Sequence, residues 1–247
     1  MNNPTNRLIL TIYLSQVFCV LGLIMFWDFS YLLYSIIGVF LFVSLGQECY
    51  MHRYLAHQTY KVSRVFEIFL HICSIYALQG SAINWAAYHV THHKYSDITG
   101  DPHPAKEGWK SWLWLNELNS SNANISTIKR LAKNKFYKFT REYYLAIYLI
   151  SLIFVSVINI KITIYLFLLP AMWAFHASGF VTVILHRYGY RNFNLEDTSK
   201  NLLIANFIVG NPLHNNHHAR PGNYNDAIKE NEFDIHGLLI HHVLRKL

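Results

Sequence analysis

The sequence predicts an all-α integral membrane protein with four transmembrane helices and a cytoplasmic helical cap that holds a metal site. First, 53% of the residues are hydrophobic and only 14% are charged, against about 25% charged in a typical soluble domain. Second, the apolar residues come in long runs rather than in amphipathic spacing, which is typical of membrane proteins. Third, histidines gather in three tight clusters that follow or lie near these runs.

Four segments are long and apolar enough to span a bilayer. Leu8–Trp27 contains no charge, and twenty helical residues extend for about 30 Å. Tyr31–Gly46 follows after a very short turn, which forces the two segments into an antiparallel hairpin. Tyr143–Ile160 and Ile162–Leu185 form a second hairpin around Lys161. The first segment lacks a small-residue cleavage site and a second apolar run follows it, so we interpret it as a retained helix.

The basic residues predict the orientation. Of the 21 lysines and arginines, only Lys161 lies in a turn between two spans, whereas twelve lie in 47–142 and seven in 186–247. The positive-inside rule therefore predicts that both termini, both long polar segments and all three histidine clusters face the cytoplasm. We predict one domain over residues 1–247, with transmembrane hairpins at about 8–46 and 143–185 and a cap formed by 47–142 and 186–247.

Two further segments belong to this cap. Phe66–Ile83 is a fifth apolar stretch, but a fifth span would put the second histidine cluster across the membrane from the first. We therefore predict a helix that lies in the membrane interface or packs beneath the cap. Residues 117–135, rich in Asn, Ser and Lys, predict a solvated loop with some helix.

The net charge and the cysteines exclude other classes. A formal charge of +7 is one feature of nucleic-acid-binding proteins. Here the basic residues lie almost wholly outside the apolar runs, as juxtamembrane charges do, and we expect no nucleic-acid partner. Cys19, Cys49 and Cys73 form no CxxC pair and no even disulfide framework, so we expect buried thiols.

The histidine clusters carry most of the chemical information. Spacing of i, i+3 and i+4, found in two clusters, puts three side chains on one face of a helix. The remaining pair is five residues apart, which an ideal helix would not align but a distorted helix end could. Imidazole is the commonest side-chain metal ligand, and eight imidazoles exceed the four or so that one tetrahedral ion takes, so we predict two metals. The clusters read His52-Arg-Tyr-Leu-Ala-His57, His89-Val-Thr-His92-His93 and His214-Asn-Asn-His217-His218.

The evidence for a metal-ligand role differs among the other histidines. His186 stands alone, but it lies at the predicted cytoplasmic end of the fourth span, at the depth of the clusters. His176 is ten residues earlier, roughly 15 Å further along the helix axis, and is left out. A surface or packing role is expected for those without ligand spacing, which are His71, His236, His241 and His242.

No carboxylate lies inside any cluster, so the glutamate-bridged pattern of soluble di-iron bundles is absent. An all-nitrogen ligand set suits iron, zinc or copper. Redox-active iron is favoured, because it can activate dioxygen next to an apolar substrate. Glu48, Asp97 and Asp101 have two readings of equal weight: they accept hydrogen bonds that orient the ligand imidazoles, or they cap helices and sit in water.

These residues and their flanks resemble the membrane fatty acid desaturase family, specifically its acyl-CoA (stearoyl-CoA, Δ9-type) branch. The resemblance runs from Gln47 to about Asp234 and agrees in order, spacing and flanks. It covers the first cluster, Trp85 to Asp97, Asp101-Pro102-His103, His186 to Phe193, and the third cluster.

The resemblance implies two irons bound by nine histidines beneath the four helices. It also implies a narrow, kinked tunnel for an acyl chain, shaped by Trp85, and it places His103 in a motif that is not a ligand. Family members often carry an asparagine that contacts one metal through water where this chain has Thr182, whose hydroxyl could hold the same water. The implied ligands are His52, His57, His89, His92, His93, His186, His214, His217 and His218.

The implied activity is the insertion of a cis Δ9 double bond into a saturated acyl chain linked to CoA, acyl carrier protein or a lipid. It would use O2 and two electrons from a carrier such as ferredoxin or cytochrome b5. The short chain is similar to bacterial members without a cytochrome b5-like domain. Two alternatives stay open: a di-iron lipid or alkane hydroxylase, and a non-catalytic metal-binding or metal-transport protein. The nearly charge-free spans count against an ion path.

Overall fold

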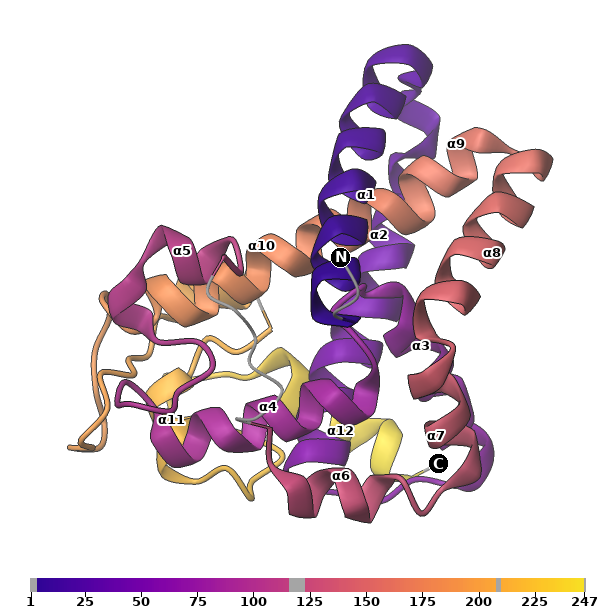
Figure 1. Cartoon of the computed structure of the whole chain (residues 1–247). Coiled ribbons are helices and arrows are strands. Elements are labelled where there is room, and N and C mark those ends of the chain that lie inside the picture. The colour runs from indigo at the N-terminus through magenta and orange to yellow at the C-terminus, as the bar shows by residue number, and fades with distance from the viewer. Residues whose placement is uncertain (1–3, 116–122, 208–209, 247) are drawn as a thin grey trace.

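A computed structural model describes residues 4–115, 123–207 and 210–246, and in these ranges the chain is helical, with two isolated β-bridges and no longer strand (Figure 1). Short 3-10 turns occur at Phe29–Tyr31, Ala105–Glu107, Leu203–Phe207 and Leu244–Lys246. The helices are α1 Pro4–Phe26, α2 Leu32–Gly38, η2 Val39–Ala56, α3 Arg64–Tyr76, α4 Ala82–Tyr95, α5 Trp109–Trp112, α6 Ile125–Leu131, α7 Lys135–Glu142, α8 Tyr144–Ile158, α9 Ile160–Ile162, η5 Thr163–Leu168, α10 Leu169–Ile184, α11 His214–Ala219 and α12 Ile235–His242.

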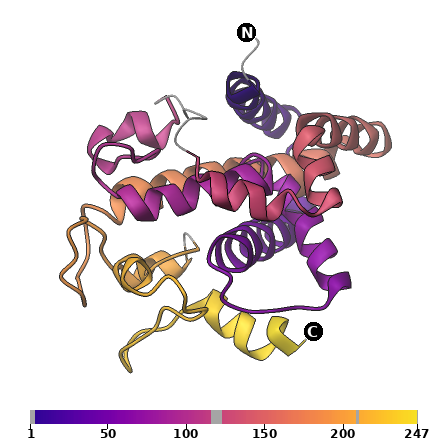
Figure 2. The ribbon, with the colours of Figure 1, turned by 60° about the horizontal axis from the view of Figure 1, so that its bottom comes forward.

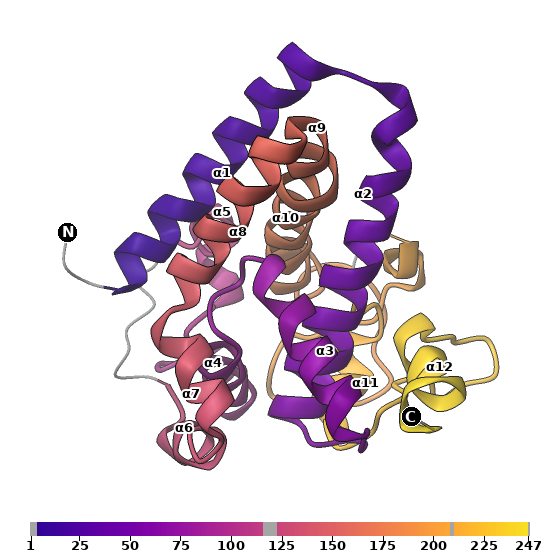
Figure 3. The ribbon, with the colours of Figure 1, turned by 90° about the vertical axis from the view of Figure 1, so that its right-hand side faces the viewer.

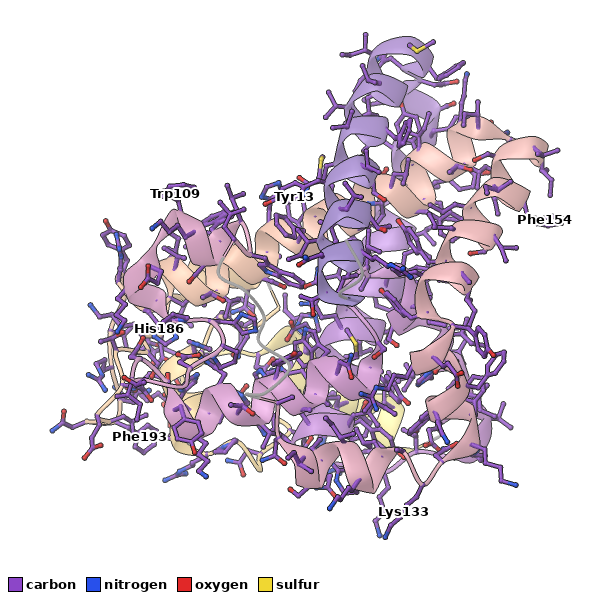
Figure 4. All side chains as sticks on the ribbon, viewed as in Figure 1. Tyr13, Trp109, Lys133, Phe154, His186 and Phe193 are labelled. Carbon is purple, nitrogen blue, oxygen red and sulfur yellow. The ribbon has the colours of Figure 1, made fainter. Side chains whose placement is uncertain are left out.

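Three continuous helices are long and apolar enough to cross a membrane: Thr5–Phe26, Phe29–Ala56 and Ile160–Ile184. A fourth candidate is the pair α7 and α8, which meet at a bend of 72°. Apolar side chains of α8 such as Phe154, 67% exposed, point away from the helical bundle (Figure 4). The described residues therefore form the predicted all-helical structure, and three or four of their helical segments could span a membrane.

The second apolar helix is longer than predicted. We expected it to end at Gly46, but η2 continues to Ala56 as a π-helix. The polar residues that follow Gly46 are not at a solvated helix end, because Gln47, Glu48 and Arg53 are buried against the rest of the protein. The helix therefore carries the chain without interruption from its apolar half to the first histidine cluster.

The two apolar hairpins interlock. Figure 3 shows α8, α9 and α10 passing between α1 and α2. The turns at the tips of the hairpins also meet: the Lys161 ammonium lies 2.6 Å from an Asp28 carboxylate oxygen, and the Asp28 amide donates to the Tyr165 hydroxyl at 2.7 Å. The single basic residue of these turns thus pairs with an acid of the other hairpin.

The fifth apolar stretch is not one helix. α3 covers its first part and packs against η2. The helix then ends at Tyr76, and the connection to α4 places Leu78 at φ 53° and Gly80 at φ 88°. The expectation of one helix over Phe66–Ile83 was therefore wrong, because this left-handed backbone breaks it.

The predicted loop over 117–135 lies partly outside the described residues, and the remainder contains α6, whose first turn is capped by Asn124.

Gly46 allows η2 and α3 to approach closely. A Cβ atom at this position would lie 2.7 Å from the backbone carbon of Cys73 and the backbone nitrogen of Ser74. Gly46→Ala is therefore expected to push the two helices apart and to destabilise the protein by about 1–3 kcal/mol. Thermal unfolding in detergent measures the effect. Gly222→Ala is the matched control, since no atom lies within 4 Å of its Cβ, and equal melting temperatures for the two variants would contradict the close packing.

Whereas α5 packs against α10, most of the shorter helices gather at one end of the apolar bundle. α4, α6, α7, α11 and α12 lie there around the lower half of η2 (Figure 1). At that end, α4 and α12 both pack against η2 (Figure 2). Buried apolar residues of η2, α4 and α12 form one core, which includes Tyr50, Ile83 and Ile240. This end of the molecule holds all three histidine clusters.

Candidate metal centre

The first histidine pair is aligned by the π-helical geometry of η2. On an ideal α-helix, residues five apart differ by about 140° in direction. Here the His57 amide donates to the His52 carbonyl, an i to i+5 hydrogen bond at 3.2 Å, and the two rings lie 5.1 Å apart. The distorted helix end that the spacing required is therefore present.

The second and third clusters lie on α4 and α11, and each helix serves two groups of histidines. We expected the three histidines of each cluster to share one face. Neighbouring positions on a helix differ by about 100°, however. His89 and His93 therefore join one group and His92 the other, whereas His217 separates from its own neighbours in the same way.

All nine predicted ligands fall into these two groups, and within each group the potential ligand atoms lie within 4.8 Å of one another. Among the described residues, neither group contains a cysteine or a carboxylate. The five-histidine group is His52, His57, His89, His93 and His217; the four-histidine group is His92, His186, His214 and His218.

The contacts within the five-histidine group cannot be satisfied by hydrogen bonds alone. The Nε2 atom of His93 lies 3.0 Å from the Nε2 atoms of both His89 and His217. His89 and His217 each have a second Nε2 neighbour as well, at 2.8 Å. A neutral imidazole nitrogen carries either one hydrogen or one lone pair, so it cannot serve two neighbours. A bound metal ion would use the lone pairs of all five rings.

The same distances fit a metal with ligands at right angles. Two nitrogens bound at about 2.0–2.1 Å lie about 2.8–3.0 Å apart at 90°, and about 3.3–3.4 Å apart at the tetrahedral angle. The observed separations of 2.8–3.0 Å, including 3.0 Å between His186 and His214, match the first value. The five-histidine group also offers one ligand nitrogen more than the four that a tetrahedral zinc takes.

Four of the buried histidines are held neutral, as metal ligands must be. Burial lowers the pKa of His89, His93, His214 and His217 well below the ordinary value, and neighbouring histidines lower it further. Each of these four rings therefore keeps one nitrogen lone pair at neutral pH, and the hydrogen bond at the other nitrogen decides which atom carries it. Protons compete weakly with a metal for these atoms.

The three acids considered from sequence all contact histidines. The outward Nδ1 atoms lie 3.2 Å from Glu48 for His52, 2.8 Å from Asp101 for His92, and 3.1 Å from Asp97 for His186. Such contacts fix the ring orientation and direct Nε2 at the metal. Asp101 also accepts hydrogen bonds from the backbone amides of Asp97 and His103, neither of which lies in a helix, so it does not cap one.

Further residues in equivalent positions were missed. Asp197 lies 3.1 Å from His218 Nδ1, Asp226 lies 3.5 Å from His217 Nδ1, and Asn211 lies 3.2 Å from His214 Nδ1. Thr198 also contacts His186 and donates to Asp97. No regular spacing relates Asp197 or Asp226 to their histidines, so only the tertiary structure reveals them.

The histidines that were left out lie outside both groups. His176 accepts a hydrogen bond from Trp112 and contacts Gln16. His71 is buried between Tyr50 and Thr140, which agrees with a packing role. His103 lies beside His92 with ring centres 6.4 Å apart but belongs to neither group.

A cavity of about 470 Å³ adjoins both histidine groups, within the range of about 300–1,000 Å³ typical of small-molecule sites. Its wall includes Trp85, which stacks on His89 at 4.9 Å, and Thr182. A hydrogen-bonded row of polar side chains, Gln47, Ser178 and Gln79, forms another part of the wall. The cavity also reaches the exposed residues Arg7 and Arg141 and is therefore open to the surface.

The sequence matches known proteins over most of its length. Residues 9–225 match the family model described as Fatty acid desaturase. The chain is 30% identical over 193 residues to the sn-1 stearoyl-lipid 9-desaturase of Anabaena variabilis, an alignment covering 76% of this chain and 69% of that protein. It is 32% identical over 201 residues to the acyl-CoA 5-desaturase AL21 of Anemone leveillei, covering 78% and 61%. The sn-2 palmitoyl-lipid 9-desaturase of Nostoc sp. (strain 36) is 30% identical over 234 residues, covering 89% and 81%. The chain thus spans between about three fifths and four fifths of these relatives.

Proposed function

This chain belongs to the fatty acid desaturase family, and from that premise we propose that it introduces a cis Δ9 double bond into a saturated fatty acyl chain. Two of the relatives are named as 9-desaturases of stearoyl or palmitoyl lipids. The observation that carries the proposal is a cavity open to the surface and flanked by both histidine groups. In the reaction, two hydrogens leave adjacent methylenes, and O2 takes up these with two electrons and two protons to give two waters.

The nine histidines would hold two iron ions, five in one group and four in the other. Bound there, the irons would supply the activation of O2 that an unactivated C–H bond requires, since no acid or base can remove its hydrogen. The five-histidine group offers more ligand nitrogens than tetrahedral zinc takes, and an all-nitrogen set suits iron, which supports this choice of metal. The protein's own residues contribute the ligand geometry, the exclusion of water and the position of the substrate.

The cavity wall would select the position of the double bond. Trp85 is held against His89 and forms a rigid surface next to the five-histidine group. Thr182 lines the cavity together with His92 and His214 of the four-histidine group, where its hydroxyl can hold a water. An acyl chain that enters to a fixed depth presents one carbon pair to the centre. We expect the substrate to be linked to a lipid, CoA or acyl carrier protein.

The orientation and the electron supply are part of the same proposal. Apart from Lys161, every lysine and arginine lies in the N-terminal residues or in the two polar segments, which supports cytoplasmic termini and a cytoplasmic metal centre. One domain would contain the hairpins 8–46 and 143–185 and the cap. A basic cytoplasmic face suits an acidic electron carrier such as ferredoxin or cytochrome b5.

Expression in a desaturase-deficient host, followed by fatty acid profiling, tests the proposed reaction. The expected product is a cis-9 monounsaturated acyl chain that depends on O2. A hydroxylase would give an alcohol instead. A non-catalytic metal-binding protein would leave both the acyl profile and the oxygen consumption of the host unchanged, and either of these results would refute the desaturase proposal.

A further inference from the structure

One ion-pair network connects the first and third histidine clusters outside the metal groups. Arg53, next to His52 on η2, is completely buried. Its guanidinium lies 2.7 Å from Asp234 and donates to Asp226 at 3.0 Å and to the Tyr224 carbonyl at 2.7 Å. These partners belong to the segment between α11 and α12. Arg53 therefore fixes the chain that follows the third cluster against the helix that carries the first.

The network ends at a metal-facing histidine. Asp226 directs Oδ2 at Arg53, and its Oδ1 lies 3.5 Å from Nδ1 of His217. Both Asp226 Oδ1 and His217 Nδ1 are buried and have no hydrogen-bond partner in the described part of the chain. The corresponding contacts at His92, His186 and His218 measure 2.8–3.1 Å. Of these four carboxylate–histidine contacts among the described residues, only the Asp226–His217 contact has no hydrogen bond between its facing atoms.

Metal binding supplies the reason for this open contact to close. When Nε2 of His217 binds a metal, its proton must lie on Nδ1, which then needs an acceptor. Asp226 Oδ1 is the acceptor at that position. We propose that Arg53 and Asp226 are positioning residues for the metal of the five-histidine group: Arg53 holds Asp226, and Asp226 selects the tautomer and direction of His217. This inference rests on the proposed metal centre.

Asp226→Asn is the discriminating variant. An asparagine has one oxygen, and the Arg53 guanidinium, which has only hydrogens to donate, attracts that oxygen. The amide NH2 would then face His217 Nδ1 and favour the tautomer with the proton on Nε2, which cannot bind a metal. A comparable carboxylate-to-amide change beside a catalytic histidine acts through the wrong tautomer in serine proteases. Arg53 and Asp234 remain as a balanced ion pair, which favours an intact fold.

The test compares metal affinity and the Mössbauer spectrum of iron-loaded, full-length wild-type and variant protein. We expect Asp226→Asn to bind one of its two irons about 10–100-fold more weakly, and to change the signal of that iron while the other stays as in wild type. Glu232→Gln is the matched control: Glu232 is a buried acid of the same segment that contacts Tyr190, Asn192 and Asn216 but no histidine. It should keep both wild-type signals.

The outcomes separate the two proposals. Two irons with unchanged affinity and spectra in Asp226→Asn would overturn the positioning role alone. A wild-type protein that binds fewer than two irons would overturn the metal centre as well. If Asp226→Asn does not accumulate, Asp226→Glu serves instead, because it keeps the partner of Arg53 and displaces the carboxylate by one methylene. The same single iron signal should change, and an unchanged spectrum would count against the proposal.

Discussion

Alanine in place of His217 or His93 is expected to remove the unsaturated product from the desaturase-deficient host, a loss of at least about 100-fold, while the protein still accumulates. Both side chains belong to the five-histidine group and lie 3.0 Å from each other through Nε2. Residues that only orient a metal ligand contribute about 10–100-fold, so the loss of the ligand itself should be larger. Fatty acid profiling and iron analysis of the purified variants measure the effect.

The control for these variants is His242→Ala. His242 is exposed and lies outside both histidine groups, so its removal tests whether any loss of imidazole impairs the enzyme. We expect wild-type product from this variant. Wild-type product from His93→Ala or His217→Ala, at equal protein level, would show that these side chains are not ligands.

Arg53→Met is expected to have the largest effect on stability, about 3–5 kcal/mol, because it leaves Asp226 and Asp234 buried without their guanidinium. For a chain of this size the loss corresponds to a fall in Tm of roughly 6–20 °C. Burial raises the pKa of Asp234, but the neighbouring Arg53 guanidinium lowers it by more and holds it below its ordinary value. Ionised Asp234 therefore stabilises the wild-type fold at pH values above the pKa that Asp234 has in the unfolded chain. The loss of stability in Arg53→Met should be larger at pH 7 than at pH 4.

Thermal unfolding of the metal-free protein in detergent measures this penalty. The triple variant Arg53→Met, Asp226→Asn and Asp234→Asn removes the unpaired carboxyl groups and should recover most of the loss. Asn remains an effective N-cap at position 234, where Asp234 caps α12. If Arg53→Met melts with the wild type, the buried network does not stabilise the fold.

The sequence predicted those features that depend on the spacing of residues within one segment. Uncharged runs predict membrane helices because each residue contributes a fixed rise, and α1 lies where Leu8–Trp27 was expected. The i, i+3 and i+4 spacing predicted that His89, His92 and His93 share a helix, and they lie on α4. The five-residue spacing of His52 and His57 required a distorted helix end, and the π-helical η2 supplies one.

Other features depend on contacts that no local pattern encodes. The 100° between neighbouring helix positions separates His92 from His93, but which histidines of other segments complete each group depends on the tertiary structure. Asp197 and Asp226 reach their histidines through folded loops rather than helical spacing. The continuation of the second helix past Gly46 was missed because polar residues usually mark a solvated end, whereas Arg53 is buried by an ion pair that the tertiary structure provides.

The unbroken helix from Phe29 to Ala56 also limits how the gene can vary. No loop separates its apolar half from His52, so an inserted or deleted codon between them cannot be absorbed locally. Each added residue in an α-helical part would rotate the imidazoles by about 100° and advance them by about 1.5 Å. Insertions and deletions should therefore be tolerated in the surface loops of this protein. Within the helix from Phe29 to Ala56 they should be eliminated by selection.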